Sequence, residues 1–326
     1  MGPYVPGSSR GENRLGMMSN IKTHAKGENK PRVLHVIPGV APWMGGPTKA
    51  IKTIVGEQLE RGLPVEILAT DTTLDSEQIK ELESVLPIHF QKTNFFPDIS
   101  IRVLFWLRKH LHNFDVVHIH SFFSFTCIIG AYWARRLGKP YIIRPCGAFD
   151  SWPMEQRSFK KNLFLKALGL DLLNSAAGLH VTSRLEVMAA DSLQIDAPKF
   201  LIPLGFHINS HREEQKKSPT KIREAVTFLF LARLHPKKNL EGILEAFARV
   251  RGSGKNLKLL IAGDGPTDYV RQLKDKADEL HISAQCEFLG HVSGAEKQRA
   301  YDASDVYILP SMGENFGISV VEALNE

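Results

Sequence analysis

The feature that most constrains the fold is an alternation, along nearly the whole chain, of short apolar runs with longer amphipathic segments. Short apolar runs are typical of buried strands, and amphipathic segments are typical of helices that pack on a sheet. Strands that alternate with helices form parallel sheets with helices on both faces, so an α/β fold is expected. The strands expected in the first half are residues 33–37, 65–69, 88–91, 116–119, 141–144, 178–181 and 200–202, and the clearest helices are 48–61 and 101–113.

The length of 326 residues exceeds the usual size of one domain, so two domains are expected. After Gly205 the composition changes to a polar, charged stretch without apolar periodicity, which reads as an interdomain linker. A second α/β series begins at Val226. The expected divisions are a disordered tail at 1–30, a first domain at 31–210, a linker at 211–224 and a second domain at 225–326.

Composition limits the class of protein. Hydrophobic content of 43% and charged content of 23% are ordinary for a soluble globular protein. Cys127, Cys146 and Cys286 show no paired metal-ligand spacing, which argues against a zinc site or a disulfide framework and fits a reducing cytoplasm. The net charge of +6 needs no nucleic acid as its explanation, and no basic-aromatic module stands out. The tail lacks the apolar region of a secretory signal, and no apolar run reaches the roughly 18 residues of a spanning helix.

The segment 309–322, LPSMGENFGISVVE, reads as a strand end, a tight loop and a helix N-terminus. Backbone N–H groups at a helix N-terminus carry a partial positive charge and can bind an anion such as a diphosphate. Glu314 and Glu322 flank this loop eight positions apart, a spacing that corresponds to a rise of roughly 12 Å in a helix. Two carboxylates at that separation could hold the hydroxyls at opposite ends of one elongated ligand, and a nucleotide sugar has that shape.

This glutamate spacing resembles the donor-site motif of the retaining, nucleotide-sugar-dependent glycosyltransferases of family 4. VTFLFLARLHPKKN at 226–239 is similar to that family's first second-domain strand and its G-R-L-x-x-x-K-G/N motif, with Ala232 in place of the usual Gly. LLIAGDGP at 259–266 is similar to its next strand and turn. The resemblance runs from about Pro31 to the last residue and implies the GT-B fold, in which two Rossmann-like parallel-sheet domains face a cleft.

The resemblance assigns expected roles in the second domain. Arg233 and Lys238 match residues that contact the donor diphosphate, Glu322 matches the glutamate that binds the ribose hydroxyls, and Glu314 matches the one near the sugar ring. The rival interpretations are a solvated Arg–Lys pair at a helix start and glutamates favoured by a helix dipole. The remaining expected donor contacts are Gly265, Asn315, Phe316 and Gly317. No cofactor and no metal is expected, because an Arg and a Lys can offset the charge on the leaving diphosphate.

In the first domain, Gly45 and Gly46 open a helix after the first strand, as the family's Gly-rich loop does, although any turn before a helix can look alike. DVVHIHS at 115–121 resembles the family's H-x-H, whose second histidine contacts the transferred sugar; His120 is the match. His118 and His120 point to the same face of a strand, and a structural histidine is the rival interpretation for His120. Cys146, Leu204 and His207 stand where the family has His, Asn and Asp, which makes altered specificity conceivable.

The resemblance implies a retaining enzyme that moves a hexosyl unit from a nucleotide diphosphate sugar to a glycan or lipid-linked acceptor. Residues 157–168 interleave cations with apolar side chains, which suits either peripheral contact with the inner membrane face or an ordinary surface helix. The second domain reads as incomplete, because the family adds further units after Glu322. The alternatives are therefore a non-catalytic remnant or partner subunit, and an epimerase or hydrolase of the same fold.

Overall fold

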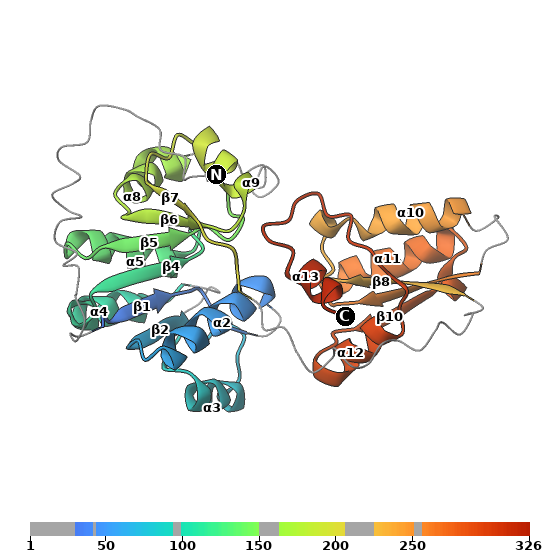
Figure 1. Ribbon diagram of the computed structural model, residues 1–326, viewed down its shortest axis with the longest axis horizontal. Helices are drawn as coiled ribbons and strands as arrows, with labels where there is room; N and C mark the ends of the chain where they lie inside the picture. The colour runs from blue at the N-terminus through green and yellow to red at the C-terminus, as the bar shows by residue number, and fades with distance from the viewer. Residues whose placement is uncertain (1–29, 42–43, 94–98, 150–162, 206–224, 251–255) are drawn as a thin grey trace.

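The computed structural model describes residues 30–41, 44–93, 99–149, 163–205, 225–250 and 256–326. Two parallel sheets, each flanked by helices, make up this part of the chain (Figure 1). This arrangement confirms the expected α/β fold. Residues 1–29 of the expected tail, the expected linker, the segment 157–162 and His207 lie outside the described residues.

The first sheet has seven strands in the order β3-β2-β1-β4-β5-β6-β7, all paired in parallel. Its strands are β1 Val33–Val36, β2 Val65–Thr70, β3 Ile88–Gln91, β4 Val116–His120, β5 Tyr141–Arg144, β6 Gly178–Val181 and β7 Lys199–Leu201. Its helices include α2 Gly46–Glu60, α3 Ser76–Val85, α4 Ile101–His110, α5 Phe125–Arg136, α8 Leu170–Asn174 and α9 Arg184–Ser192. The strands expected from apolar runs match these bounds to within two residues at either end.

The second sheet has four strands in the order β10-β9-β8-β11, again all parallel. Its strands are β8 Val226–Leu231, β9 Leu257–Ala262, β10 Cys286–Gly290 and β11 Val306–Tyr307. Its helices are α10 Leu240–Val250, α11 Thr267–Glu279, α12 Gly294–Asp302 and α13 Ile318–Leu324, with a 3-10 turn at Pro236–Lys238. The apolar run that ends at Leu309 forms a strand only at Val306 and Tyr307, where β11 pairs with β8, and the backbone N–H of Ile308 still donates to the carbonyl of Leu229 at 2.9 Å.

Apolar cores lie on both faces of each sheet, as the alternation of strands and helices predicts. Leu34 and Val36 of β1 pack in the core under α4 and α5, whereas Val33 and Ile37, which directly follows β1, pack in the core under α2. The second sheet likewise has one core under α10 and α11 and a smaller one beside α12. Fully buried parallel strands are usually apolar on both faces. The buried histidines of β1, β4 and β6 depart from that rule.

The strand order reverses at one point in each sheet, and these points place the site. In the first sheet β1 lies between β2 and β4, and in the second β8 lies between β9 and β11. Open parallel sheets bind ligands beyond the carboxyl ends of their strands at such switch points. The loops that follow β1, β8, β9 and β11 carry most of the candidate residues expected from the sequence, while His120 ends β4 and Glu322 lies in α13.

Candidate functional site

The segment after β8 and the loop after β11 are in direct contact, which unites two of the expected donor motifs. Lys238 forms an ion pair with Glu314, and Ser311 Oγ donates to the same carboxylate at 2.7 Å. The backbone N–H of Met312 donates to the carbonyl of Lys237 at 2.8 Å. A cation and a carboxylate expected to serve one ligand therefore lie side by side at the switch point of the second sheet.

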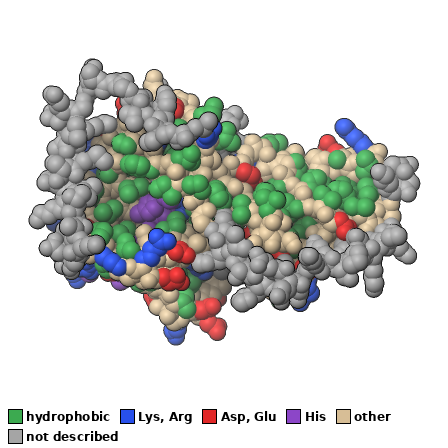
Figure 2. Space-filling view, viewed as in Figure 1, with side chains coloured by type: hydrophobic (Ala, Val, Ile, Leu, Met, Phe, Trp, Pro, Cys, Tyr) green, Lys and Arg blue, Asp and Glu red, His purple; other side chains and the backbone are tan. Residues whose placement is uncertain are grey.

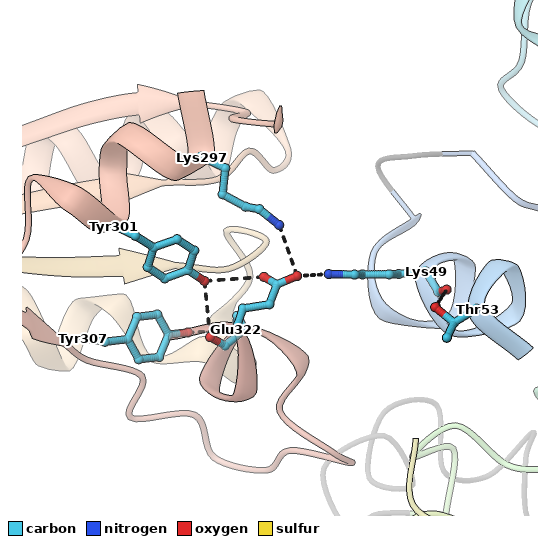
Figure 3. A network of polar contacts seen from close by, with 7 residues as sticks. Lys49, Thr53, Lys297, Tyr301, Tyr307 and Glu322 are labelled. Carbon is cyan, nitrogen blue, oxygen red and sulfur yellow. Dashed lines mark hydrogen bonds and ion pairs between the residues drawn. The ribbon is translucent and has the colours of Figure 1, made fainter. Parts of the chain in front are cut away.

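Glu322 lies at the junction of the two domains. Its Oε1 is ion-paired with Lys49 of α2 and lies 3.1 Å from Nζ of Lys297 of α12, as Figure 3 shows. The Tyr301 hydroxyl donates to its other oxygen at 3.4 Å. Burial lowers the pKa of both lysines, and their mutual repulsion lowers that of Lys49 further. A carboxylate offers about four acceptor positions, so Glu322 keeps capacity for ligand hydroxyls beside these partners.

A cavity of about 670 Å³ opens beside this ion-pair network. Its lining comes from both domains and includes Lys49 and Thr53 of α2, together with Phe316 and Glu322. Two of the expected donor contacts therefore face one cavity. Lys49 and Lys297 were not singled out from the sequence, and no local motif marks either residue.

A second cavity, of about 430 Å³, lies between the loop after β1 and the segment after β8. His120 lines it from the first domain, and Arg233, His235 and Lys237 line it from the second, with no Asp or Glu among the described lining residues. Burial and the nearby charges of Arg233, Lys238 and Lys237 lower the pKa of His235. An anion in this cavity would meet positive charge on the second-domain side.

His120 is fully buried, and both of its ring nitrogens have protein partners. Arg144 donates to Nδ1 at 3.2 Å, and Nε2 lies 2.9 Å from Nδ1 of His35. Because a guanidinium can only donate, Nδ1 of His120 is the acceptor and Nε2 carries the proton. His35 then donates from Nε2 to Oε1 of Gln58 at 2.8 Å. Hydrogen bonds therefore run in one direction from Arg144 through His120 and His35 to Gln58. Partners of this kind are typical of a structural histidine. The expected contact of His120 with the sugar stays a prediction.

His35, His118 and His120 offer ring nitrogens within 4.8 Å of one another, a spacing that could suit a metal ion. Burial holds the pKa of each ring below its ordinary value, so the rings are neutral near pH 7. The Arg144 guanidinium opposes metal binding, however. A metal-bound histidine normally donates its other N–H to an acceptor, whereas Nδ1 of His120 faces a buried cation. The three histidines therefore suit the chain of hydrogen bonds that begins at Arg144, which we call the Arg144 relay, better than they suit a metal site.

The glycines expected at the site occupy positions where a side chain would clash or strain the backbone. A Cβ at Gly265 would lie 2.2 Å from the carbonyl oxygen of Leu234, and one at Gly46 would lie 3.3 Å from Ile318 in the other domain. Gly45 and Gly317 have φ of 79° and 69° and precede α2 and α13. Gly265 is therefore required by close packing, and Gly45 and Gly317 by left-handed backbone that glycine adopts without strain.

Two non-glycine residues beside the second cavity have left-handed backbone that the sequence did not predict. Ser121 has φ of 90° and Cys146 has φ of 57°, and both line the 430 Å³ cavity. Burial raises the pKa of the Cys146 thiol, which keeps it protonated. Strained backbone of this kind clusters at ligand sites, where the surrounding structure holds it in place.

The distribution of surface charge and the lengths of the helices are relevant to binding of nucleic acid and of membranes. On the face drawn in Figure 2, Lys and Arg side chains are interspersed with Asp and Glu and form no continuous basic stripe among the coloured residues. Within the described residues, no helix is long and apolar enough to cross a membrane.

Two families match consecutive parts of the chain. Residues 45–205 match the family described as Glycosyl transferase 4-like domain, and residues 211–325 match Glycosyl transferases group 1. The chain is 26% identical over 298 residues to an alpha-monoglucosyldiacylglycerol synthase of Streptococcus pneumoniae, covering 87% of this chain and 66% of that protein. It is 33% identical over 143 residues to a phosphatidyl-myo-inositol mannosyltransferase of Mycobacterium tuberculosis, covering 43% of this chain and 34% of that protein. The chain thus spans less than two thirds of the length of either relative.

Among solved structures, Anabaena HepE, determined in complex with UDP and glucose, superposes with a TM-score of 0.70 at 17% identity. The superposition covers 90% of this chain and 78% of HepE. At this identity the likeness shows that the two chains share a fold.

Proposed function

Because the chain belongs to the group 1 glycosyltransferases of family 4, we propose that it transfers a hexosyl unit from a nucleotide diphosphate sugar to a hydroxyl of a glycan or lipid-linked acceptor, with retention of configuration. The observation that carries the proposal is the 430 Å³ cavity, which Arg233, His235 and Lys237 line opposite the loop after β1. Its positive wall lies at the carboxyl end of β8, where a parallel sheet binds phosphates.

The charges of this wall suit the leaving group. When the glycosidic bond to the diphosphate breaks, negative charge grows on the phosphate oxygens, and positioned cations stabilise that charge. Lys238 is neutralised by Glu314 in this structure. A bound diphosphate would replace Glu314 as the partner of Lys238 and release Glu314 towards the sugar ring. The same exchange would thus leave Lys238 on the diphosphate and Glu314 free to contact the sugar. No metal is needed for this role, because Arg233 and Lys238 supply the positive charge.

Different observations support the nucleotide sugar as donor and the lipid-linked molecule as acceptor. Glu322 and Phe316 line the 670 Å³ cavity, which gives a ribose and base a place beside the diphosphate wall. HepE, which shares the fold, was solved with UDP and glucose. The names of the two relatives described above each contain a lipid, monoglucosyldiacylglycerol and phosphatidyl-myo-inositol, which supports a lipid-linked acceptor here. We place the reaction in the cytoplasm, at the inner membrane face for such an acceptor, consistent with three free thiols.

Isothermal titration calorimetry with UDP-glucose and GDP-mannose tests the proposal, with Arg233→Ala as the control. Saturable binding that the control loses would support the donor site and identify the nucleotide. Transfer of labelled sugar to a lipid or glycan acceptor, without epimerised or hydrolysed donor, would then establish the reaction. A cooperatively folded protein that binds neither nucleotide sugar would refute the proposal and favour a non-catalytic role.

A further inference from the structure

A buried carboxylate in the first domain receives hydrogen bonds from three separate segments. Glu186, in the first turn of α9, is 1% exposed. It accepts from the backbone N–H of Gly147 at 2.7 Å, and from the N–H and hydroxyl of Thr182 at 2.8 and 3.0 Å. Every one of these partners is a donor, which is the pattern of a carboxylate ion. The N-terminal end of α9 adds a favourable dipole.

The third segment comes from the other domain. The hydrogen-bonding pattern orients the Asn315 amide with its nitrogen towards Glu186, 2.8 Å from Oε1 and 2.9 Å from Oε2. The same nitrogen lies 3.0 Å from the Thr182 hydroxyl. Asn315 follows Glu314 in the loop after β11, so this loop is held by the first domain as well as by its own. A hydrogen bond to a buried ion is stronger than one between neutral groups.

We propose that Asn315 is a positioning residue, which Glu186 and Thr182 hold across the domain junction so that the loop 311–317 is set in its donor-binding form. The proposal rests on the proposed function, because it assigns the contact to donor binding. The same carboxylate also holds Gly147, which lines the 430 Å³ cavity. Glu186 therefore contacts both the first-domain wall of that cavity and the second-domain loop that carries Glu314. Through these two contacts it sets the position of the loop relative to the wall.

The contact can be removed without disturbing the first domain. Glu186 keeps its bonds to Gly147 and Thr182 when the Asn315 side chain is absent, so Asn315→Ala leaves no buried donor of that domain unpaired. Asn315→Asp goes further and places a second carboxylate beside Glu186, where like charges repel. The matched control is Asn113→Asp, which makes the same chemical change at an exposed site of the first domain.

Two measurements test the proposal. The first is hydrogen–deuterium exchange of the peptide that contains residues 311–317, which needs no activity. We expect amide exchange to be about tenfold faster in Asn315→Asp, less so in Asn315→Ala, and unchanged in Asn113→Asp. The second is the dissociation constant for whichever of UDP-glucose and GDP-mannose the protein binds. We expect it to rise about tenfold in Asn315→Asp, and the double variant Glu186→Gln with Asn315→Asp to recover part of the loss.

The outcomes separate this proposal from the proposed function. Unchanged exchange of the loop in Asn315→Asp would overturn the positioning role whatever the protein binds. Faster exchange with an unchanged dissociation constant would overturn it too, because the contact would then hold the loop without serving the donor. Faster exchange in Asn315→Asp, found together with a wild-type protein that binds neither nucleotide sugar, would support the contact and refute the proposed donor instead.

Discussion

At the scale of single residues, the second domain presents several cations in one short segment and neutralises one of them with a neighbouring carboxylate. Arg233 and Lys237 line the 430 Å³ cavity together with His235, whose pKa is lowered by burial, whereas Lys238 is ion-paired with Glu314. Both side chains of that pair are partly exposed, so solvent weakens their attraction. The pair is therefore a weak contributor to stability and can open when a ligand offers stronger partners.

The first prediction concerns Glu314. Replacing it with Gln keeps the shape and the hydrogen bond from Ser311 but removes the charge that we propose acts beside the sugar ring. We expect transfer to fall by about a hundredfold, the size of effect seen when one charge-stabilising group is lost from an active site. Steady-state kinetics measure the loss of transfer, and thermal melting followed by circular dichroism checks that the variant is folded. Glu296→Gln, at an exposed position in α12, is the control; a turnover number for Glu314→Gln equal to that of the control would rule out the assigned role.

At the scale of elements, the site depends on how closely the turns after neighbouring strands approach. The backbone N–H of Leu234, after β8, donates to the carbonyl of Asp264, after β9, at 2.8 Å. Gly265 then passes against the Leu234 carbonyl with no room for a Cβ. The turn after β9 therefore packs directly against the Arg233 segment, and the closeness of this contact requires a glycine at position 265.

The second prediction compares two Gly→Ala changes. At Gly265 the added Cβ meets backbone 2.2 Å away, so the turn must shift; we expect a loss of about 1–3 kcal/mol in the free energy of unfolding. At Gly56, inside α2, the added Cβ has nothing within 4 Å, and alanine favours the helix, so a gain of about 0.5–1 kcal/mol is expected. Urea denaturation of both variants gives the values. Equal effects of the two changes would show that the turn is not close-packed.

Local patterns predicted the elements well. Apolar runs located the strands to within two residues, and strand alternation predicted that His118 and His120 share a face, as their ring centroids 4.3 Å apart show. Turn residues and the motif order located the segments after β8 and β11. Apolar runs, strand alternation and turn residues are patterns of residues close together in the sequence. They therefore predict features that depend on local structure, such as where a strand begins and which face a side chain lies on.

The partners of these residues could not be predicted in the same way. Lys49 meets Glu322 across 273 residues, and Thr182 meets Asn315 across 133. Nothing in the sequence around Lys49 or Thr182 marks such a contact, because it depends on how the two domains pack. The relay from Arg144 through His120 to His35 joins three strands for the same reason, so sequence reasoning left the role of His120 between two interpretations.

At the scale of the whole molecule, the first sheet carries a polar row through its buried interior. His35 of β1, His118 and His120 of β4, and His180 of β6 lie on one face, together with Arg144 of β5. His118 and His180 are hydrogen-bonded at 3.3 Å, and the row ends at the carbonyl of Ile202. Burial lowers the pKa of all four histidines, and the charge of Arg144 lowers each further.

This row makes the stability of the fold sensitive to acid. The pKa of His35 falls from 6.5 to about 4. Below pH 6.5 the unfolded chain takes up a proton at this residue and the folded chain does not, so its contribution is fully present above pH 6.5 and is lost as the pH falls towards 4. Between pH 7 and pH 5, His35 alone should remove about 2 kcal/mol from the free energy of unfolding, and the other three act in the same direction.

Urea denaturation at pH 7, 6 and 5 measures the third prediction. We expect the free energy of unfolding to decrease at each step, more steeply below pH 6. His35→Gln should flatten this dependence, because Gln neither titrates nor needs to stay neutral, whereas His112→Gln, at an exposed position, should leave it unchanged. A free energy of unfolding that stays constant from pH 7 to pH 5 would mean that the buried histidines take up protons in the folded state. The Arg144 relay would then have to rearrange, since a protonated His120 cannot accept from a guanidinium.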